Sequence, residues 1–154
     1  MKRIMFVCHG NICRSPMAEF IFKDMIKKQG LDREFLVASS ATSAEEIWNG
    51  IGNPIYPPAK AELKKHGIIA EGKRAVQLCA EDYDKYDLFI GMDSANIRNM
   101  NRILKGDPEG KIHKLKDYSG SGGDVSDPWY SDRFDIAFSD IYEGCQALLA
   151  ELTK

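Results

Sequence analysis

The chain of 154 residues has the length of one ordinary domain and is too short for two, so we expect a single domain over residues 1–154. Charged residues make up 29% of the chain and the formal net charge is −2, which argues against general affinity for nucleic acid. No apolar stretch approaches the roughly 20 residues of a membrane span, and the first apolar run is shorter than the roughly 7–15 residues of a secretion signal. We therefore expect a cytoplasmic protein that binds neither nucleic acid nor a membrane.

The four cysteines, at positions 8, 13, 79 and 145, show no repeated CxxC or cysteine–histidine spacing. This pattern predicts neither a zinc site nor a disulfide scaffold, so we expect no metal and no other cofactor. Reduced thiols are typical of a cytosolic protein.

Four short hydrophobic runs alternate with amphipathic segments along the chain. The runs at 3–7, 35–39 and 88–91 are almost continuously apolar, as buried parallel strands are, and a weaker run lies at 111–115. Helical signals, namely apolar stripes at helical spacing or a proline start with a glycine end, occupy the segments 17–30, 57–66, 94–104 and 134–152. This alternation predicts an α/β fold with a doubly wound, Rossmann-like parallel sheet of four strands and helices on both faces.

Three loops separate these elements, at 40–58, 106–110 and 119–128. In a doubly wound sheet, ligands bind beyond the carboxyl ends of the strands. The turn CHGNICRS at 8–15 follows the first strand and therefore lies on that edge.

The composition of this turn suits an oxyanion. Gly10 and Asn11 tolerate left-handed backbone angles best, which lets consecutive N–H groups point inward as an anion nest. The helix that begins near Arg14 directs its positive N-terminus at the same point, and the guanidinium can bind two phosphate oxygens at once. We predict a phosphate-binding loop made of His9, Gly10, Asn11, Ile12, Cys13, Arg14 and Ser15.

Cys8 is the candidate nucleophile at the base of this loop. The N–H donors, the helix dipole and Arg14 all favour its thiolate, and the hydroxyl of Ser15 can donate to it. A lone cysteine at a strand end is usually a small buried hydrophobe, but Cys-x5-Arg-Ser between a strand and an amphipathic helix favours catalysis. A nucleotide-binding P-loop is rejected because the segment lacks the GxxxxGK[ST] pattern.

The motifs VCHGNICRSP at 7–16 and DPWY at 127–130 closely resemble those of the low-molecular-weight protein tyrosine phosphatases, and the resemblance covers essentially the whole chain. It implies the fold of that family, a four-stranded parallel sheet of the phosphotyrosine protein phosphatase I type. It also implies a two-step phosphocysteine mechanism without a metal, acting on phosphotyrosine-containing proteins.

Cleavage of a phosphate ester needs a proton for the departing oxygen and later a base for water, and one carboxyl group can do both. Asp127, followed by Pro128, matches the family's general acid. Asp-Pro alone usually indicates a turn, but the presence of Cys8 in the same chain favours a catalytic role for Asp127. Asp124 and Asp132 are nearby alternatives that lack the motif position.

Tyrosine phosphate requires a deep cleft with flat aromatic walls. Trp129 and Tyr130 follow the acid and Trp48 lies in the 40–58 loop, and all three match rim positions of the family. Trp129 replaces the first of two tyrosines common in the family, which puts regulation by their phosphorylation in doubt. His9 also departs from the family, where an aliphatic residue is common, and we expect it to alter the rim charge.

The resemblance assigns supporting roles to three further residues. It implies that Cys13 forms a reversible protective disulfide with Cys8, and that His66 buttresses Asn11, although a helix-end role for His66 is equally consistent with its position. Asp93 can position Arg14 or the loop, or act as an acid at a helix N-terminus. Cys145 is expected in the core, and no role is assigned to Cys79.

Two other functions remain open at this point. Arsenate reductases share the fold and a Cys-x5-Arg loop but need a relay of further cysteines, and Cys79 has no neighbouring cysteine. A non-catalytic phosphotyrosine-binding module would not need Asp127. If the loop binds oxyanions, inorganic phosphate and vanadate should compete with the substrate.

Overall fold

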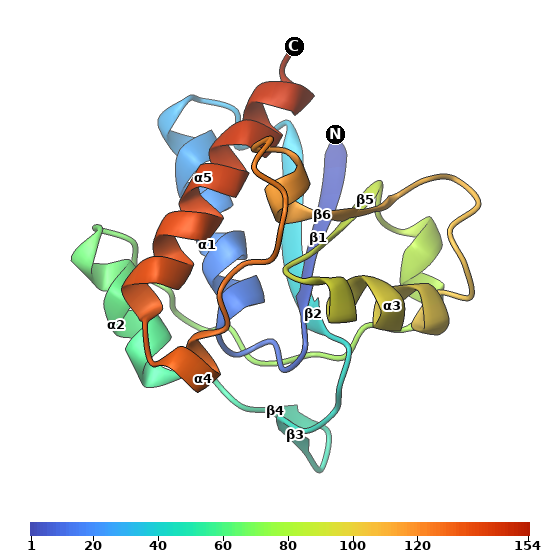
Figure 1. Cartoon of the computed structure of the whole chain (residues 1–154), viewed down its shortest axis with the longest axis horizontal. Helices are drawn as coiled ribbons and strands as arrows, with labels where there is room; N and C mark the ends of the chain where they lie inside the picture. The colour runs from blue at the N-terminus through green and yellow to red at the C-terminus, as the bar shows by residue number, and fades with distance from the viewer.

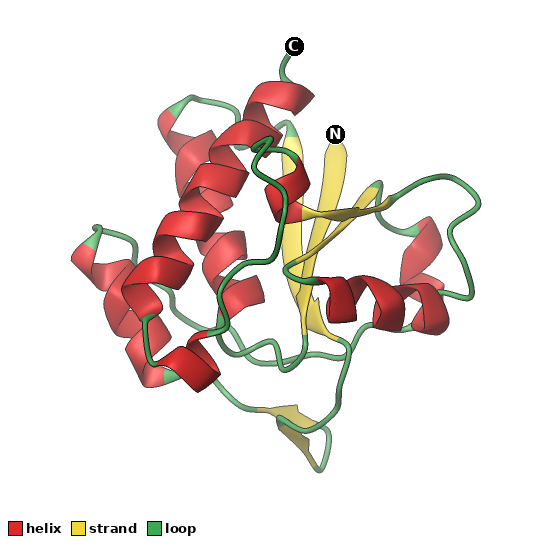
Figure 2. Cartoon of the chain, viewed as in Figure 1, coloured by secondary structure: helices red, strands yellow, loops and turns green.

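The computed structural model describes all residues, 1–154. Its main sheet contains β1 (Lys2–Cys8), β2 (Phe35–Ala41), β5 (Leu88–Gly91) and β6 (Ile112–Lys114), in the order β2-β1-β5-β6. All neighbouring pairs are parallel (Figures 1 and 2). The predicted sheet of four parallel strands is therefore confirmed. The chain leaves β1 toward β2 on one side and later returns to β5 on the other, so the switch point of the sheet lies beside the end of β1.

Helices cover both faces of the sheet (Figure 1). One face carries α1 (Arg14–Lys28), α2 (Pro57–Lys65) and α5 (Phe134–Leu152), while α3 (Ser94–Ile103) packs on the other. Short helices were not predicted: the 3₁₀ helices η1 (Ala80–Asp84) and η2 (Leu115–Asp117), and α4 (Pro128–Ser131). No helix combines the length and apolar character needed to cross a bilayer.

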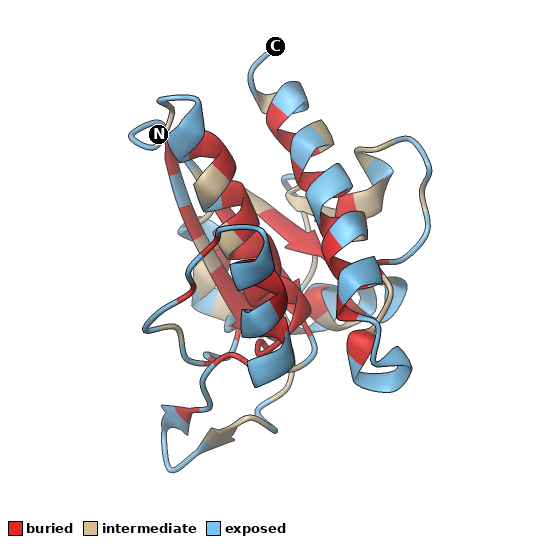
Figure 3. Ribbon diagram, turned by 90° about the vertical axis from the view of Figure 1, so that its left-hand side faces the viewer, coloured by how far each residue is buried: buried red, intermediate tan, exposed pale blue.

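Alternate residues of β1 belong to two different cores. Ile4 and Phe6 join the large cluster beneath α1 and α5, whereas Met5 and Val7 join the smaller cluster beneath α3. Strand β1 is therefore buried on both sides, as its continuous apolar sequence predicts (Figure 3). Each such side chain contributes about 1.5–3 kcal/mol when fully buried, which fixes the strand that carries the phosphate-binding loop.

A hairpin interrupts the loop expected at 40–58. It pairs β3 (Ile47–Trp48) with β4 (Ile51–Gly52) through a turn in which Asn49 and Gly50 both have positive φ, 51° and 75°. Such a two-residue turn favours asparagine followed by glycine. A Cβ added to Gly52 would lie 1.9 Å from the carbonyl oxygen of Ala75, so the position requires glycine.

Candidate active site

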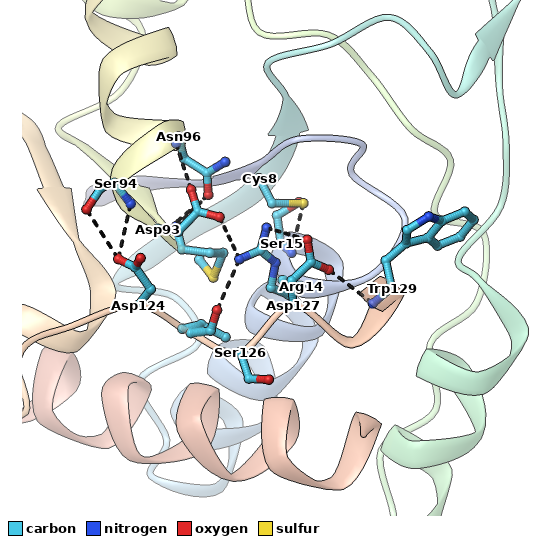
Figure 4. Close-up of polar contacts among 12 residues, drawn as sticks. Cys8, Arg14, Ser15, Asp93, Ser94, Asn96, Asp124, Ser126, Asp127 and Trp129 are labelled. Atoms are coloured by element: carbon cyan, nitrogen blue, oxygen red, sulfur yellow. Dashed lines mark hydrogen bonds and ion pairs between the residues drawn. The ribbon is translucent and has the colours of Figure 1, made fainter. Parts of the chain in front are cut away.

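The segment between β1 and α1 curls around the sulfur of Cys8. The backbone N–H groups of Asn11 and Ser15 donate to Sγ at 3.3 and 3.4 Å. The Ser15 hydroxyl lies 3.0 Å from the same sulfur (Figure 4). Asn11 has a left-handed backbone with φ of 59°, while Gly10 does not have a positive φ. Of the two residues expected to supply the left-handed turn, only Asn11 does so.

The side chain of Asn11 ties this loop to the sheet. Its Nδ2 group donates to the hydroxyls of Ser15 and Ser39 at 2.8 and 3.0 Å, and its Oδ1 atom accepts from the backbone N–H of Val76 at 3.1 Å. All polar atoms of the amide are thus engaged, which offsets the backbone cost of the left-handed conformation.

His66 does not contribute to this support, so the predicted contact with Asn11 is wrong. His66 follows the end of α2, where its ring stacks on Phe138 with centroids 3.7 Å apart and its Nε2 atom lies 3.1 Å from Glu62. The helix carries the imidazole toward α5 rather than toward the phosphate-binding loop. The hydroxyl of Ser39, rather than the imidazole of His66, contacts the side chain of Asn11.

Arg14 binds two carboxylates that lie far apart in the sequence, those of Asp93 and Asp127 (Figure 4). Its Nη1 atom donates to Asp93 at 2.9 Å and to the carbonyl of Val125 at 3.2 Å, and its Nη2 atom donates to Asp127 at 3.5 Å. The Arg14 side chain is only 4% exposed. Burial opposes its charge, but Cys8, Asp127 and Asp93 outweigh that effect and raise the pKa of Arg14 above its usual value.

Asp93 serves both of the roles considered for it. It follows β5, on the other side of the switch point from the loop, and binds Arg14 through Oδ2. Its Oδ1 atom accepts from the N–H of Asn96 at 2.8 Å, which caps the N-terminus of α3.

Asp127 is the N-cap of α4, where its Oδ1 atom accepts from the N–H of Trp129 at 3.1 Å. The residues before it are pinned at two points: Val125 donates to the carbonyl of Met92 at 2.9 Å, and Ser126 donates to Asp140 of α5 at 3.1 Å. These contacts place the second carboxyl oxygen of Asp127 beside Arg14, facing the cleft.

The alternative acid Asp124 is directed elsewhere. Its Oδ1 atom accepts from the N–H of Ser94 at 3.1 Å and from Lys114 at 3.2 Å, so it attaches the loop to the start of α3. Asp132, the other alternative, has a left-handed backbone after α4 and does not line the cleft.

A cleft of about 540 Å³ opens above Cys8. Trp129 and Tyr130 line it, as predicted, while Trp48 does not. Trp48 lies in the hairpin, where it pairs with Ile51, and it is 80% exposed. The residues that line the cleft are Cys8, His9, Gly10, Ile12, Cys13, Arg14, Glu45, Glu46, Asp93, Ala95, Asn96, Asn99, Asp127, Trp129 and Tyr130.

The rim beside the loop is more acidic than the sequence suggested. Glu45 and Glu46 reach the cleft from the segment after β2, and His9 lies 3.0 Å from the carboxylate of Glu45. Nothing in the sequence pattern places these two glutamates there.

The thiols near the site differ in environment. Cys13 lines the cleft and has no disulfide partner, and neither has Cys8. Burial, Cys8 and Asp127 together raise the pKa of Cys13 to about 12, which keeps it a neutral thiol. Cys145 lies in the core, as predicted, and Cys79 is exposed at the start of η1.

Tyr56 is a supporting residue that the sequence analysis missed. Its backbone N–H donates to the carbonyl of Ile12 at 2.9 Å, and its ring packs against Trp129 with centroids 5.0 Å apart. A single residue at the start of α2 thus contacts both the phosphate-binding loop and the segment that carries Asp127. A tyrosine before two prolines is no signal for such a role.

This arrangement can perform nucleophilic chemistry on a phosphate ester. A sulfur nucleophile lies at the base of an anion nest, a buried guanidinium borders it, and the carboxyl group of Asp127 lines the same cleft beside that guanidinium. No group of three or more His, Cys, Asp or Glu side chains is arranged to hold a metal ion.

Comparison with known proteins agrees with this chemistry. The family model described as "Low molecular weight phosphotyrosine protein phosphatase" matches residues 3–154. The low molecular weight protein-tyrosine-phosphatase YfkJ of Bacillus subtilis is 36% identical over 100% of this chain and 97% of its own length. The human low molecular weight phosphotyrosine protein phosphatase is 35% identical over 94% of this chain and 89% of its own.

Solved structures show the same likeness. The crystal structure of YfkJ superposes with a TM-score of 0.93 over 99% of this chain and 95% of its own, at 35% identity. Vibrio vulnificus Wzb in complex with benzylphosphonate superposes with a TM-score of 0.82 at 27% identity, over 97% and 98% of the two chains. Because the family model and these relatives span nearly the entire sequence, the chain belongs to the low molecular weight phosphotyrosine protein phosphatase family.

Proposed function

We propose that this protein hydrolyses phosphotyrosine in proteins, and small aryl phosphate monoesters, through a cysteinyl-phosphate intermediate. One observation carries the proposal: Sγ of Cys8 lies within 3.0–3.4 Å of three donor groups at the base of a cleft that Arg14 and Asp127 also line. Donors in this position stabilise a thiolate and, with the phosphate bound, the charge of its transferring oxygens.

In the first step the Cys8 thiolate attacks phosphorus in line with the phenolic oxygen. The S–P bond forms as the P–O bond to the tyrosine breaks, and protonated Asp127 gives its proton to the departing phenolate. Arg14 and the loop amides hold the three equatorial oxygens while charge is redistributed among them.

In the second step water replaces the phenol. Asp127, now a carboxylate, takes a proton from the water as its oxygen attacks phosphorus. The S–P bond breaks, inorganic phosphate leaves, and the electron pair returns to Cys8 as a thiolate that the Ser15 hydroxyl stabilises by donating to it.

The shape of the cleft favours an aryl ester. Trp129 and Tyr130 line the cleft together with the residues of the anion nest and supply aromatic rings against which a phenyl ring can pack. Benzylphosphonate, the ligand of the Wzb complex, has this combination of an aryl ring and a tetrahedral anion. Inorganic phosphate and vanadate should compete with the substrate, and a reducing, cytoplasmic location suits the free thiol of Cys8.

Neither alternative function has comparable support. An arsenate reductase needs further cysteines that take over a disulfide from the first one. Cys79 lies outside the cleft, where its S–H donates to Asp82 in η1. A binding module would not need a carboxyl group aimed at the leaving-group side, which Asp127 supplies. Cys13 remains a candidate for reversible protection of Cys8.

The test compares Cys8→Ser and Asp127→Asn with Asp132→Asn, a control acid near the same helix that does not line the cleft. Cys8→Ser should abolish turnover. Asp127→Asn should slow phenyl phosphate hydrolysis by about 10²–10⁴-fold and affect 4-nitrophenyl phosphate less, because the more acidic nitrophenol leaves without a proton.

Asp132→Asn should behave as the unaltered protein with both substrates. Turnover that survives Cys8→Ser, or arsenate reduction without aryl phosphate hydrolysis, would refute the proposed function. Equal losses on the two substrates for Asp127→Asn would refute the role of the general acid.

A further inference from the structure

Two glutamates that the mechanism does not use, Glu45 and Glu46, line the catalytic cleft. They belong to the segment that leads from β2 into the hairpin of β3 and β4 (Figure 1). This segment is tied to the nucleophile through its backbone, because the N–H group of Thr42 donates to the carbonyl of Cys8 at 2.9 Å. Both carboxylates are therefore held at the cleft that receives the phosphorylated side chain in the proposed function.

Each glutamate is oriented by a partner other than a lysine or arginine. Oε2 of Glu45 lies 3.0 Å from Nε2 of His9, which must be the donor because an ionised carboxylate only accepts. The backbone N–H of Glu45 donates to the hydroxyl of Ser43 at 3.0 Å. Oε1 of Glu46 accepts from Nδ2 of Asn53 at 2.9 Å. One oxygen of each carboxylate is thus fixed by the protein, and the other accepts no hydrogen bond within the chain.

The cleft offers these glutamates little positive charge. Arg14 is the only lysine or arginine that lines it, and its guanidinium binds both Asp93 and Asp127. Arg98 of α3 lines an adjoining hollow rather than the cleft. A phosphotyrosine adds about 1.5–2 further negative charges at pH 7. A substrate that carries no positive charge near its phosphotyrosine therefore meets electrostatic repulsion from the two glutamates.

We propose that Glu45 and Glu46 are specificity-determining residues, which make the enzyme select phosphotyrosines that have a lysine or arginine as a direct neighbour in sequence. The ammonium or guanidinium group of that neighbour binds the free carboxylate oxygens, whereas an acidic neighbour is repelled. The proposal rests on the proposed function, because it takes the phosphate-binding loop as the binding site of the phosphotyrosine.

The test uses short phosphopeptides in which alanines surround one phosphotyrosine, and the residue before or after it is arginine, alanine or glutamate. Phosphate release gives kcat/KM for each peptide, and the ratio between the arginine and alanine peptides is the readout. The unaltered protein is compared with Glu45→Gln, Glu45→Lys and the double variant Glu45→Gln/Glu46→Gln. The matched control is Glu71→Gln, since Glu71 is as exposed as Glu45 and pairs with Lys60, but lies outside the cleft.

At one or both positions, the unaltered protein should prefer the arginine peptide to the alanine peptide by about threefold, a size typical of one exposed ion pair. It should prefer the alanine peptide to the glutamate peptide by a similar factor. Glu45→Gln should reduce the first ratio, the double variant should bring it close to one, and Glu45→Lys should reverse the order of the peptides. Glu71→Gln should keep the full preference. High salt should weaken the preference of the unaltered protein, because salt screens exposed charges.

Equal kcat/KM for all peptides in the unaltered protein would overturn the proposal, and so would a preference that survives in the double variant or falls equally in Glu71→Gln. A preference for the glutamate peptides would also overturn it. If the double variant does not fold, Glu45→Lys decides, since Glu45 is 67% exposed. Hydrolysis of every peptide without preference would refute this inference alone, whereas a protein that hydrolyses none of them would refute the proposed function as well.

Discussion

Replacing Asp93 separates two contributions that one carboxylate makes. Asp93→Asn keeps a good N-cap for α3 but removes the charge beside Arg14, whereas Asp93→Ala removes both. A hydrogen bond to a charged group contributes about 1.5–3 kcal/mol, and Arg14 retains Val125 and Asp127 as partners. We therefore expect Asp93→Asn to cost about 1.5–2 kcal/mol, at the lower end of that range.

Asp93→Ala should cost about 1 kcal/mol more, the usual value of an N-cap. Activity should behave differently: kcat/KM should fall by a similar factor, about tenfold, in both variants, because both lose the ion pair with Arg14 and the N-cap does not contact the guanidinium. Urea unfolding and aryl phosphate kinetics measure the two effects. Equal stabilities of Asp93→Asn and Asp93→Ala would refute the capping argument. A clearly larger loss of kcat/KM in the less stable Asp93→Ala than in Asp93→Asn would refute the positioning argument.

Substitutions in three further parts of the chain test the fold. Asn11→Ala should lower the free energy of unfolding, measured with urea, by about 1 kcal/mol more than Asn11→Gly. Both variants lose the hydrogen bonds of the amide, but only alanine disfavours a φ of 59°. A lower stability of Asn11→Gly would contradict this reasoning. Gly52→Ala should destabilise the protein by about 3 kcal/mol, because the new Cβ would meet the backbone of Ala75. Gly50→Ala, whose Cβ meets no atom, should cost only about 1 kcal/mol, and similar thermal shifts for the two variants would exclude the clash. The hydrogen bonds from Arg3 lower the pKa of Asp87 below its ordinary 3.8. The stability that this pair contributes should therefore be present above pH 3.8 and be lost as the pH falls through the lower pKa of the folded protein. Asp87→Asn should remove this dependence, and parallel curves of unfolding free energy against pH for the two proteins would show that the pair is unimportant.

The sequence predicted β1 and β5 well because side chains on both faces of these strands are buried. A continuous apolar run such as that of β1 has few alternatives, and the helices beside it carry clear amphipathic stripes. The hairpin of β3 and β4 was missed because its strands contain only two residues each, too few for any periodicity. The pair Asn49-Gly50 was the available signal.

The site was predictable where one local motif carries the chemistry. Cys8 and Arg14 lie within a single turn, and Asp127 is marked by the proline that follows it. Support that depends on helix orientation was not predictable: His66 lies one residue past α2, and the direction of that helix turns it toward Phe138. Tyr56 supports the loop partly through its backbone N–H, which any residue but proline could donate.

The double burial of β1 has a consequence for how motion is distributed over the site. Cys8 ends the strand shared by both cores, so its amide neighbours should exchange with deuterium only through global unfolding. The segment before Asp127 contains Gly120, Gly122 and Gly123, all with left-handed backbones and open space around them, and should exchange by local opening. Cys8 is thus built on a strand that both cores bury, while Asp127, which must both give and take a proton, follows a glycine-rich segment.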